Sequence, residues 1–266
     1  MSILVNNDEF RILERHEKCD IKFVSALEVN KNAKIVFENV PLTDFKQGDI
    51  GNCGLIAALA AISQRLEFLS EISPKIENTS EGIKVHFKMF YKGNPVVVTI
   101  DDKLPYLFSD DKISLIYAKS ANGDSLYLAS LFEKAVVKLV CNSNYNNSEG
   151  IQPYNVFSLF SECMVSCCVW LETDLKQNVI DYLKYEVDNK SSVVLCITPD
   201  VIFKPDSISK RGHAYVIMDY NLEHKAFKLY DQSMCTNYFT DFERNLPLSI
   251  TNTADRSKGE RWITLD

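Results

Sequence analysis

A glycine-rich turn that leads into a long apolar segment constrains the fold more than any other part of this sequence. Residues 47–62 read QGDIGNCGLIAALAAI. Gly48 and Gly51 give the turn its conformational freedom. The segment therefore predicts an apolar helix over residues 53–68, opened by Cys53. The apolar side chains that recur at helical spacing are Leu55, Ile56, Leu59, Ile62 and Leu66.

The remaining hydrophobic pattern predicts an α+β protein with two lobes, because helical patterns dominate the first half and strand patterns the second. Polar residues 142–150 are the best candidate for the passage between the lobes. We expect a leader at residues 1–33, a helical lobe bearing Cys53 at 34–160 and a β-rich lobe at 161–266. The other expected elements are a hairpin at 84–105, helices at 125–140 and 174–187, and strands at 114–120, 192–198, 213–222 and 225–232.

Cys53 has the setting that a thiol nucleophile needs. The positive end of a helix dipole stabilises a thiolate over a thiol, so the first residue of a helix favours a reactive cysteine. Gln47 lies six residues upstream, and its side-chain amide can donate a hydrogen bond to a developing oxyanion. A cysteine after a turn is also commonly a small buried apolar residue. The choice between these interpretations depends on whether a base is present.

His213 is the best candidate for that base among the four histidines of the chain. His16, His86 and His224 lie in charged or ordinary strand contexts, whereas His213 begins a strongly apolar strand. The next strand ends at Asp231, and antiparallel pairing across the turn at 221–225 brings its carboxylate near His213. A carboxylate there can accept the second imidazole N–H and orient the ring. Taken singly, each residue also has an ordinary structural interpretation, as a satisfied histidine and as a turn aspartate.

Composition excludes several other classes of protein. The net charge of −7 argues against nucleic acid and anionic membranes as partners, and no apolar run is long enough to span a bilayer. The N-terminus lacks the basic start and apolar core of a signal peptide. The eight cysteines are irregularly spaced, and most lie among apolar residues, which indicates reduced thiols and a cytoplasmic location. Cys163, Cys167 and Cys168 lack the paired spacing of a zinc site, so a metal-binding protein is the least favoured interpretation.

Five segments of the sequence resemble the protease core of the calpain family, which comprises papain-like intracellular cysteine proteases. QGDIGNCGLIAALAAI resembles the family's Gln-Gly-x-x-Gly-x-Cys-Trp-Leu-Leu-Ala-Ala segment, and GHAYVIMDY resembles its Gly-His-Ala-Tyr. The other three are VVVTIDDKLP, IYAKSANGDSLYLASLFEKAVVKL and KGERWITLD. The resemblance covers roughly residues 34–266. It implies a papain-like fold with an active-site cleft between a helical lobe and a β-rich lobe, and an endopeptidase that cuts intracellular proteins through an acyl-enzyme.

The resemblance also assigns expected roles to individual residues. Cys53 matches the nucleophile, His213 the general base and Gln47 the oxyanion donor. Gly212 matches the glycine whose backbone helps to hold substrate, and Gly51 is expected to contribute to substrate binding as well. Asp231 falls where the family has the asparagine of its Asn-Pro-Trp triplet.

Two departures from the family pattern leave a second interpretation open. The tryptophan after the nucleophile is replaced by Gly54, and the Asn-Pro-Trp triplet is replaced by Asp231, Gln232 and Ser233. Asp231 can still orient an imidazole and stabilise an imidazolium, but the loss of the indole weakens water exclusion. The alternative is therefore a weak or inactive pseudoprotease that binds a peptide or protein partner in its cleft. The sequence leaves the oligomeric state open.

The resemblance implies calcium dependence, but the expected ligands are incomplete. Asp44 matches one carboxylate of the family's calcium site, whereas the expected glutamate partner aligns with Asn146, and the second acidic loop is not recognisable. One carboxylate makes a weak site for an ion that takes six to eight oxygen ligands. We therefore expect no cofactor to be required, and calcium to change activity little.

Overall fold

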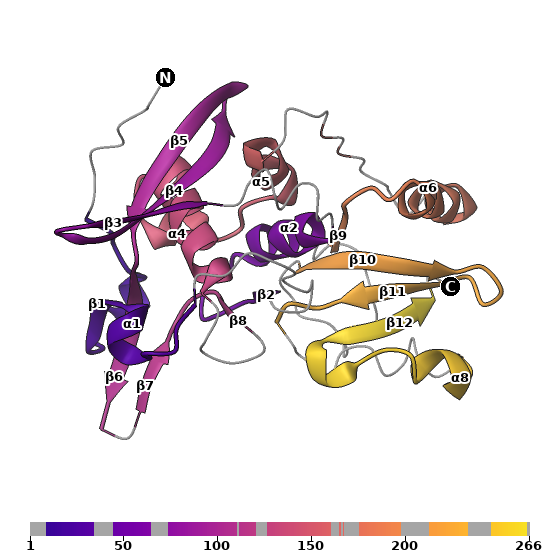
Figure 1. Cartoon of the computed structure of the whole chain (residues 1–266). Helices are drawn as coiled ribbons and strands as arrows, with labels where there is room; N and C mark the ends of the chain where they lie inside the picture. Colours follow the sequence, from indigo (N-terminus) through magenta and orange to yellow (C-terminus); the bar gives the residue numbers. More distant parts are fainter. Residues whose placement is uncertain are drawn as a thin grey trace.

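The structure is a computed structural model that describes residues 9–34, 45–64, 74–110, 112–120, 127–160, 165, 167, 176–197, 213–233 and 246–264. Its elements fall into two groups with helix α2 between them (Figure 1). The chain is a mixed α+β protein, as the sequence predicts.

The first group contains three small antiparallel sheets and most of the helices. The sheet orders are β1-β6-β7, β3-β4-β5 and β2-β8. The strands are β1 (Ile21–Ser25), β2 (Phe45–Lys46), β3 (Lys75–Thr79), β4 (Gly82–Tyr91), β5 (Asn94–Asp101), β6 (Lys103–Ser109), β7 (Lys112–Leu115) and β8 (Lys119–Ser120). The helices are η1 (Glu14–His16), α1 (Ala26–Val29), α2 (Cys53–Ser63), α4 (Leu128–Val140), η3 (Tyr145–Ser148) and α5 (Pro153–Phe160).

The second group is built on one antiparallel sheet of order β12-β11-β10-β9. Along β10, Tyr215 and Ile217 pack with helix α6, whereas Ala214 and Val216 belong to the core around α2. This alternation follows the two-residue period of a strand. The elements are α6 (Lys176–Asp188), β9 (Val193–Ile197), β10 (His213–Asn221), β11 (Ala226–Tyr230), α8 (Leu248–Thr251), η4 (Arg256–Lys258) and β12 (Glu260–Thr264).

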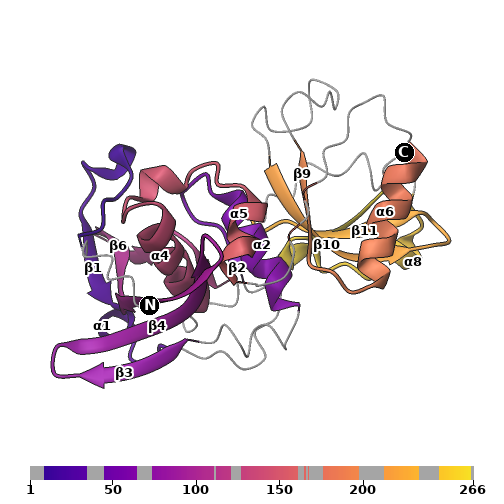
Figure 2. The ribbon, with the colours of Figure 1, turned by 90° about the horizontal axis from the view of Figure 1, so that it is seen from above.

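Helix α2 is buried on every side. All its residues from Gly54 to Ser63 are buried, as expected for a helix that is apolar all round. One hydrophobic core joins it to α4, α5 and the β4–β5 hairpin, and also to Ala214, Val216 and Tyr230 of the second group. Figure 2 shows α2 between α5 and the sheet that carries β10. The position of Cys53 at the start of this helix therefore depends on both groups.

Most expected elements are present, with differences at their ends. The hairpin predicted at 84–105 is formed by β4 and β5, and the expected strand at 114–120 is divided between β7 and β8. Helix α4 begins at Leu128 rather than at 125, and α2 ends at Ser63 rather than at 68. Residues 65–73 and 121–126 lie outside the described part of the chain.

Residues 142–150, the expected passage between the lobes, are hydrogen-bonded to the N-terminal part of the chain. Arg11 N donates to Ser143 O at 2.8 Å, and Tyr145 N donates to Arg11 O at 3.0 Å. Tyr145 and Ser148 are buried, and α5 continues in the first group by packing on α2. The polar side chains of this segment suggested a solvated linker, but hydrogen bonds with residues 11–15 hold it in place.

Close packing between α2 and the start of α5 explains why residue 54 is glycine. A Cβ at this position would lie 2.1 Å from Ile151 O and 3.0 Å from Pro153 Cδ. Contact with a backbone oxygen at 2.1 Å requires the chain itself to shift. The tryptophan of the family motif therefore has no room at this position.

We expect Gly54→Ala to lower the free energy of unfolding by about 1–2 kcal/mol. Overpacking costs about 1–3 kcal/mol, which outweighs the gain of about 1 kcal/mol in helix propensity. The matched control is Gly51→Ala, whose Cβ would meet the Glu149 side chain at ordinary contact distances of 3.6–3.9 Å. Urea unfolding followed by circular dichroism compares the two, and equal stabilities would contradict the packing argument.

Candidate active site

The loop before Cys53 is docked on the body of the first group. Asp49 N donates to Ile116 O at 2.8 Å, and Gly51 O accepts from Gly150 N at 2.8 Å. A Cβ at Gly48 would lie 2.2 Å from Tyr117 O, so the close approach of the two chains requires glycine there. The sequence analysis explains Gly48 by the conformational freedom of the turn. The structure adds that a larger side chain would clash with the backbone of Tyr117.

Asn52 and Glu133 hold the other side of this loop. Asn52 is the N-cap residue of α2, and its Nδ2 donates to Glu133 Oε1 at 2.6 Å. Glu133 Oε2 accepts from Ala118 N at 3.0 Å. Burial raises the pKa of Glu133 to about 7, although these two donors act to lower it. The sequence interpretation missed this pair, because nothing in the pattern of helix α4 distinguishes Glu133 from a surface carboxylate.

Cys53 lies at the first position of α2, where His213 acts on its thiol. Burial acts to raise the pKa of the Cys53 thiol, but the hydrogen bond and the charge of His213 lower it. Backbone hydrogen bonds from Ala214 and Gly54 lower it further. The net result is a pKa below that of an ordinary thiol, the condition under which a cysteine is nucleophilic near neutral pH.

His213 lies between Cys53 and Asp231. Its Nε2 donates to Asp231 Oδ1 at 3.0 Å, which leaves Nδ1 for Cys53. Burial acts to lower the pKa of His213, but its bonds to Asp231 and Cys53 raise the pKa to about 9. The ring of Tyr215 packs edge-on against the imidazole at a centroid distance of 4.7 Å. His213 is therefore an imidazolium at neutral pH, and one face has aromatic cover.

Asp231 directly follows β11, and several donors fix its carboxylate. Oδ1 accepts from Ser233 N at 2.9 Å and Ser233 Oγ at 2.6 Å, in addition to His213. The backbone N–H of Asp231 donates to Gly259 O at 2.9 Å. The contact between Asp231 and His213 is the one expected from antiparallel pairing across the turn, where Val216 lies opposite Tyr230. Ser233 was noted in the sequence only as a replacement for tryptophan, and its hydrogen bonds were not foreseen.

Gln47 is held close to the site by its neighbours. Its Nε2 donates to Ile50 O at 2.6 Å, and its backbone N donates to Gln232 O at 2.9 Å. The backbone groups of Gly51 are bonded too, through Gly150 N and Glu149 Oε1. Gly212 and Asp44, the other two expected site residues, lie outside the described residues.

Gln232 is a further residue at the site that the sequence interpretation missed. Its side chain is fully buried, and its Nε2 donates to Cys53 O at 3.1 Å and to Ala214 O at 2.8 Å. The only signal in the sequence was its place between Asp231 and Ser233. A glutamine in that place gives no indication of where its amide points.

The described part of the calcium position suggested by the family does not fit that ion. Asn146 Nδ2 donates to Ile12 O at 3.1 Å and to Asn144 Oδ1 at 2.9 Å, while Asn146 Oδ1 accepts from Glu14 N at 3.2 Å. Both ends of this amide are therefore used within the protein. The guanidinium of Arg15 lies in the same region, bonded to Glu149 and to Asp49 O. Within the described residues, no cluster of three or more His, Cys, Asp or Glu side chains suits a metal ion.

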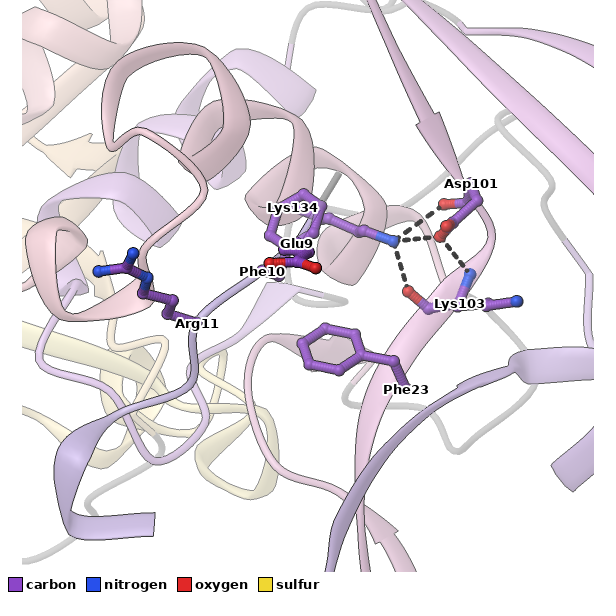
Figure 3. Close-up of a pocket in the computed structure, with 7 residues that line it drawn as sticks. All are labelled: Glu9, Phe10, Arg11, Phe23, Asp101, Lys103 and Lys134. Carbon is purple, nitrogen blue, oxygen red and sulfur yellow. Dashed lines mark hydrogen bonds and ion pairs between the residues drawn. The ribbon is translucent and has the colours of Figure 1, made fainter. Parts of the chain in front are cut away.

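A cavity of about 550 Å³ lies in the first group (Figure 3), and neither Cys53 nor His213 lines it. Lys134 lines it, and its ammonium donates to the Asp101 carboxylate, to Lys103 O at 2.6 Å and to Asp101 O at 3.3 Å. The ring of Phe10 lies 4.8 Å from the same nitrogen. All three ammonium protons thus have partners in the chain, and the cavity has no part in the Cys53 site.

Two further observations concern the chain as a whole. Cys19, Cys53, Cys141 and Cys167, whose side chains the structure describes, are free thiols. Among the described helices, none has the length and apolar character needed to cross a bilayer.

Comparison with known proteins identifies the family. The family model described as calpain family cysteine protease matches residues 4–232. The chain is 28% identical over 211 residues to the calpain-1 catalytic subunit of Rattus norvegicus, covering 75% of this chain and 28% of the relative. For the same subunit of Macaca fascicularis the identity is 32% over 210 residues, which cover 74% of this chain and 27% of the relative. Calpain-A of Drosophila melanogaster is 25% identical over 220 residues, which cover 80% of this chain and 25% of the relative.

The chain thus spans about a quarter of the length of these curated relatives. The family model covers most of the chain and includes Cys53, His213 and Asp231. The chain belongs to the calpain family of cysteine proteases.

Proposed function

We propose that this chain is a cysteine endopeptidase that hydrolyses peptide bonds in accessible segments of intracellular proteins. The observation that carries the proposal is the geometry of His213, whose Nε2 donates to Asp231 Oδ1 at 3.0 Å and whose charge lowers the pKa of Cys53. The pKa of Cys53 is lowered and that of His213 is raised to about 9. These directions favour a thiolate–imidazolium pair at neutral pH, the reactive form of a cysteine protease.

In the proposed reaction, the Cys53 thiolate attacks the peptide carbonyl carbon and forms a tetrahedral intermediate. The Cys53 backbone N–H and the Gln47 amide donate to its oxyanion. Gln47 Nε2 carries two protons, and one of them is used on Ile50 O, so the second remains for this role. His213 Nδ1 then gives its proton to the leaving amine nitrogen as the C–N bond breaks, which leaves a thioester.

Water resolves the acyl-enzyme. Neutral His213 takes a proton from water as its oxygen attacks the thioester carbonyl, and the acid leaves as the C–S bond breaks. The thiolate and imidazolium are then restored. Throughout both halves, Asp231 holds His213 Nε2–H and so keeps Nδ1 toward the sulfur.

A second candidate is a protein that binds a peptide in the cleft without turnover. Gly54 and Ser233 replace the two tryptophans of the family pattern, and the Gln47 amide is already bonded to Ile50 O. The missing indoles weaken water exclusion, and the bond to Ile50 O leaves the Gln47 amide one proton for an oxyanion. Both features favour this candidate if turnover proves absent.

The test combines turnover with covalent labelling. The chain is incubated with an unfolded protein substrate and, separately, with an epoxide probe that reacts with catalytic thiolates. Cleavage together with labelling at Cys53 supports the endopeptidase. Peptide binding without cleavage, in protein that is folded by circular dichroism, assigns the chain to the second candidate.

We further propose that the activity is independent of calcium. Because the Asn146 amide is used within the protein, we expect peptidase activity in chelator and in about 100 μM calcium to differ by less than about twofold. The assay uses the same unfolded substrate in both conditions. Activity that disappears in chelator and returns with micromolar calcium would show that other residues complete a site.

A further inference from the structure

Gln232 connects the two groups of elements at the point where the proposed nucleophile and base meet. Its side-chain amide donates to Cys53 O of α2 and to Ala214 O of β10, at 3.1 and 2.8 Å. Ala214 directly follows His213 in the chain. One amide group therefore holds the backbone of the cysteine and the backbone next to the histidine.

The carbonyl of Gln232 and the side chain of Tyr230 make two further connections between the groups. Gln232 O accepts from Gln47 N at 2.9 Å, and the Tyr230 hydroxyl donates to Phe45 O. Thus the end of β11 is bonded to residues 45, 47 and 53 of the first group. Gln232 is the member of this set whose side chain reaches Cys53 itself.

The burial of Gln232 shows that these hydrogen bonds matter energetically. The residue is fully buried, and an unpaired buried amide costs about 1–3 kcal/mol. Both amide protons of Gln232 have acceptors, one in each group of elements. An apolar side chain of similar length would fill the same space without fixing either carbonyl. The amide of Gln232 therefore fixes the positions of the two carbonyls, whereas an apolar side chain would only fill the space.

We propose that Gln232 is a positioning residue that sets the separation of Cys53 and His213 by joining α2 to β10. The family pattern has proline here, which has no side-chain donor, so this connection belongs to this chain rather than to the family motif. The effect on turnover rests on the proposed peptidase function, whereas the effect on the Cys53–His213 pair does not. A shift of about 1 Å between reacting groups can cost about a hundredfold in rate, so a smaller displacement is enough to be measured.

The test compares Gln232→Met with wild type. Methionine keeps the length and volume of the side chain but removes both donors. We expect the rate of Cys53 alkylation by iodoacetamide at neutral pH to fall by about tenfold, because Cys53 loses its alignment with His213. The pH at which Cys53 becomes reactive should also rise toward that of an ordinary thiol. Peptide mapping assigns the labelled cysteine, and kcat/KM is measured in parallel.

The matched control is Gln177→Met on the exposed face of α6. Gln177 Nε2 donates to Asp181 Oδ1 at 2.8 Å within the same helix, and α6 carries none of the proposed site residues (Figure 1). Its alkylation profile should equal that of wild type. Gln232→Asn is the second variant, because it keeps an amide that is one methylene shorter and reaches one carbonyl at most. It should give an intermediate rate, and it decides the question if Gln232→Met does not fold.

The outcomes separate this inference from the proposed function. A changed alkylation profile in the folded Gln232 variants supports the positioning role, even if the wild-type chain hydrolyses no peptide. Wild-type hydrolysis, with profiles and kcat/KM unchanged in the variants, overturns the positioning role and leaves the peptidase in place. Lower stability with an unchanged alkylation profile of Cys53 would likewise show that Gln232 contributes only to packing.

Discussion

Replacing Cys53 with alanine should lower kcat/KM for peptide hydrolysis by at least about a thousandfold, because no other group can form the acyl-enzyme. The fold should persist, since Cys53 is only partly buried and alanine is a good helix former. The matched control is Cys19→Ala, which changes an exposed thiol and should leave the rate unchanged. Full activity in Cys53→Ala would remove the residue from the mechanism.

Selective alkylation provides an independent measure of the same residue. Cys53 should react with iodoacetamide faster near neutral pH than the other cysteines, because its pKa is lowered by His213. Cys141 should be inert, since burial raises its pKa to about 11, and the exposed Cys19 and Cys167 should react more slowly than Cys53. Uniform labelling, or preference for Cys167, would contradict the nucleophile assignment.

Replacing Asp231 with alanine should lower kcat/KM by about tenfold or more, which corresponds to about 1.4 kcal/mol per factor of ten. Asp231 Oδ1 holds His213 Nε2 at 3.0 Å, and without it the imidazole is free to rotate. Asp231→Asn should retain much of the activity, because an amide oxygen can still accept that hydrogen bond. An aspartate that only stabilises the turn would leave both variants with the wild-type rate.

The same variants should change the pH dependence in a defined direction. The pKa of His213 is raised to about 9, so the thiolate–imidazolium pair is complete below that pH and is lost as the pH rises through it. Asp231→Asn replaces a carboxylate with a neutral acceptor, which lowers the pKa of His213. The alkaline limb of kcat/KM should therefore move to lower pH. Superimposable profiles for wild type and both variants would exclude Asp231 from the site.

The sequence predicts the parts of this structure that depend on local pattern. The α+β fold, the β4–β5 hairpin and the start of α2 at Cys53 follow from periodicity and turn residues. The contact between His213 and Asp231 follows from the pairing of two strands across a short turn, whose register is narrowly limited. These are relations between residues that are close in the chain.

What the sequence does not predict are relations between distant segments. Gln232 and Cys53 are 179 residues apart, and nothing local indicates that a buried amide joins them. Likewise, the pairing of Asn52 with Glu133 depends on how α4 packs beside the loop. Residues 142–150 have the composition of a linker but are held by residues 11–15. Hydrogen-bond partners of buried polar groups are fixed by tertiary packing, which a one-dimensional pattern does not contain.

The burial of α2 on all sides also affects how this chain is synthesised. The helix ends at Ser63, but β10, which covers one of its faces, begins at His213. At about 5–20 residues per second, the ribosome needs roughly 8–30 seconds to supply the strand after the helix has been made. For that interval the face of α2 that packs on β10 lacks its native cover. The segment that holds the proposed nucleophile is thus among the first to be made and among the last to be enclosed.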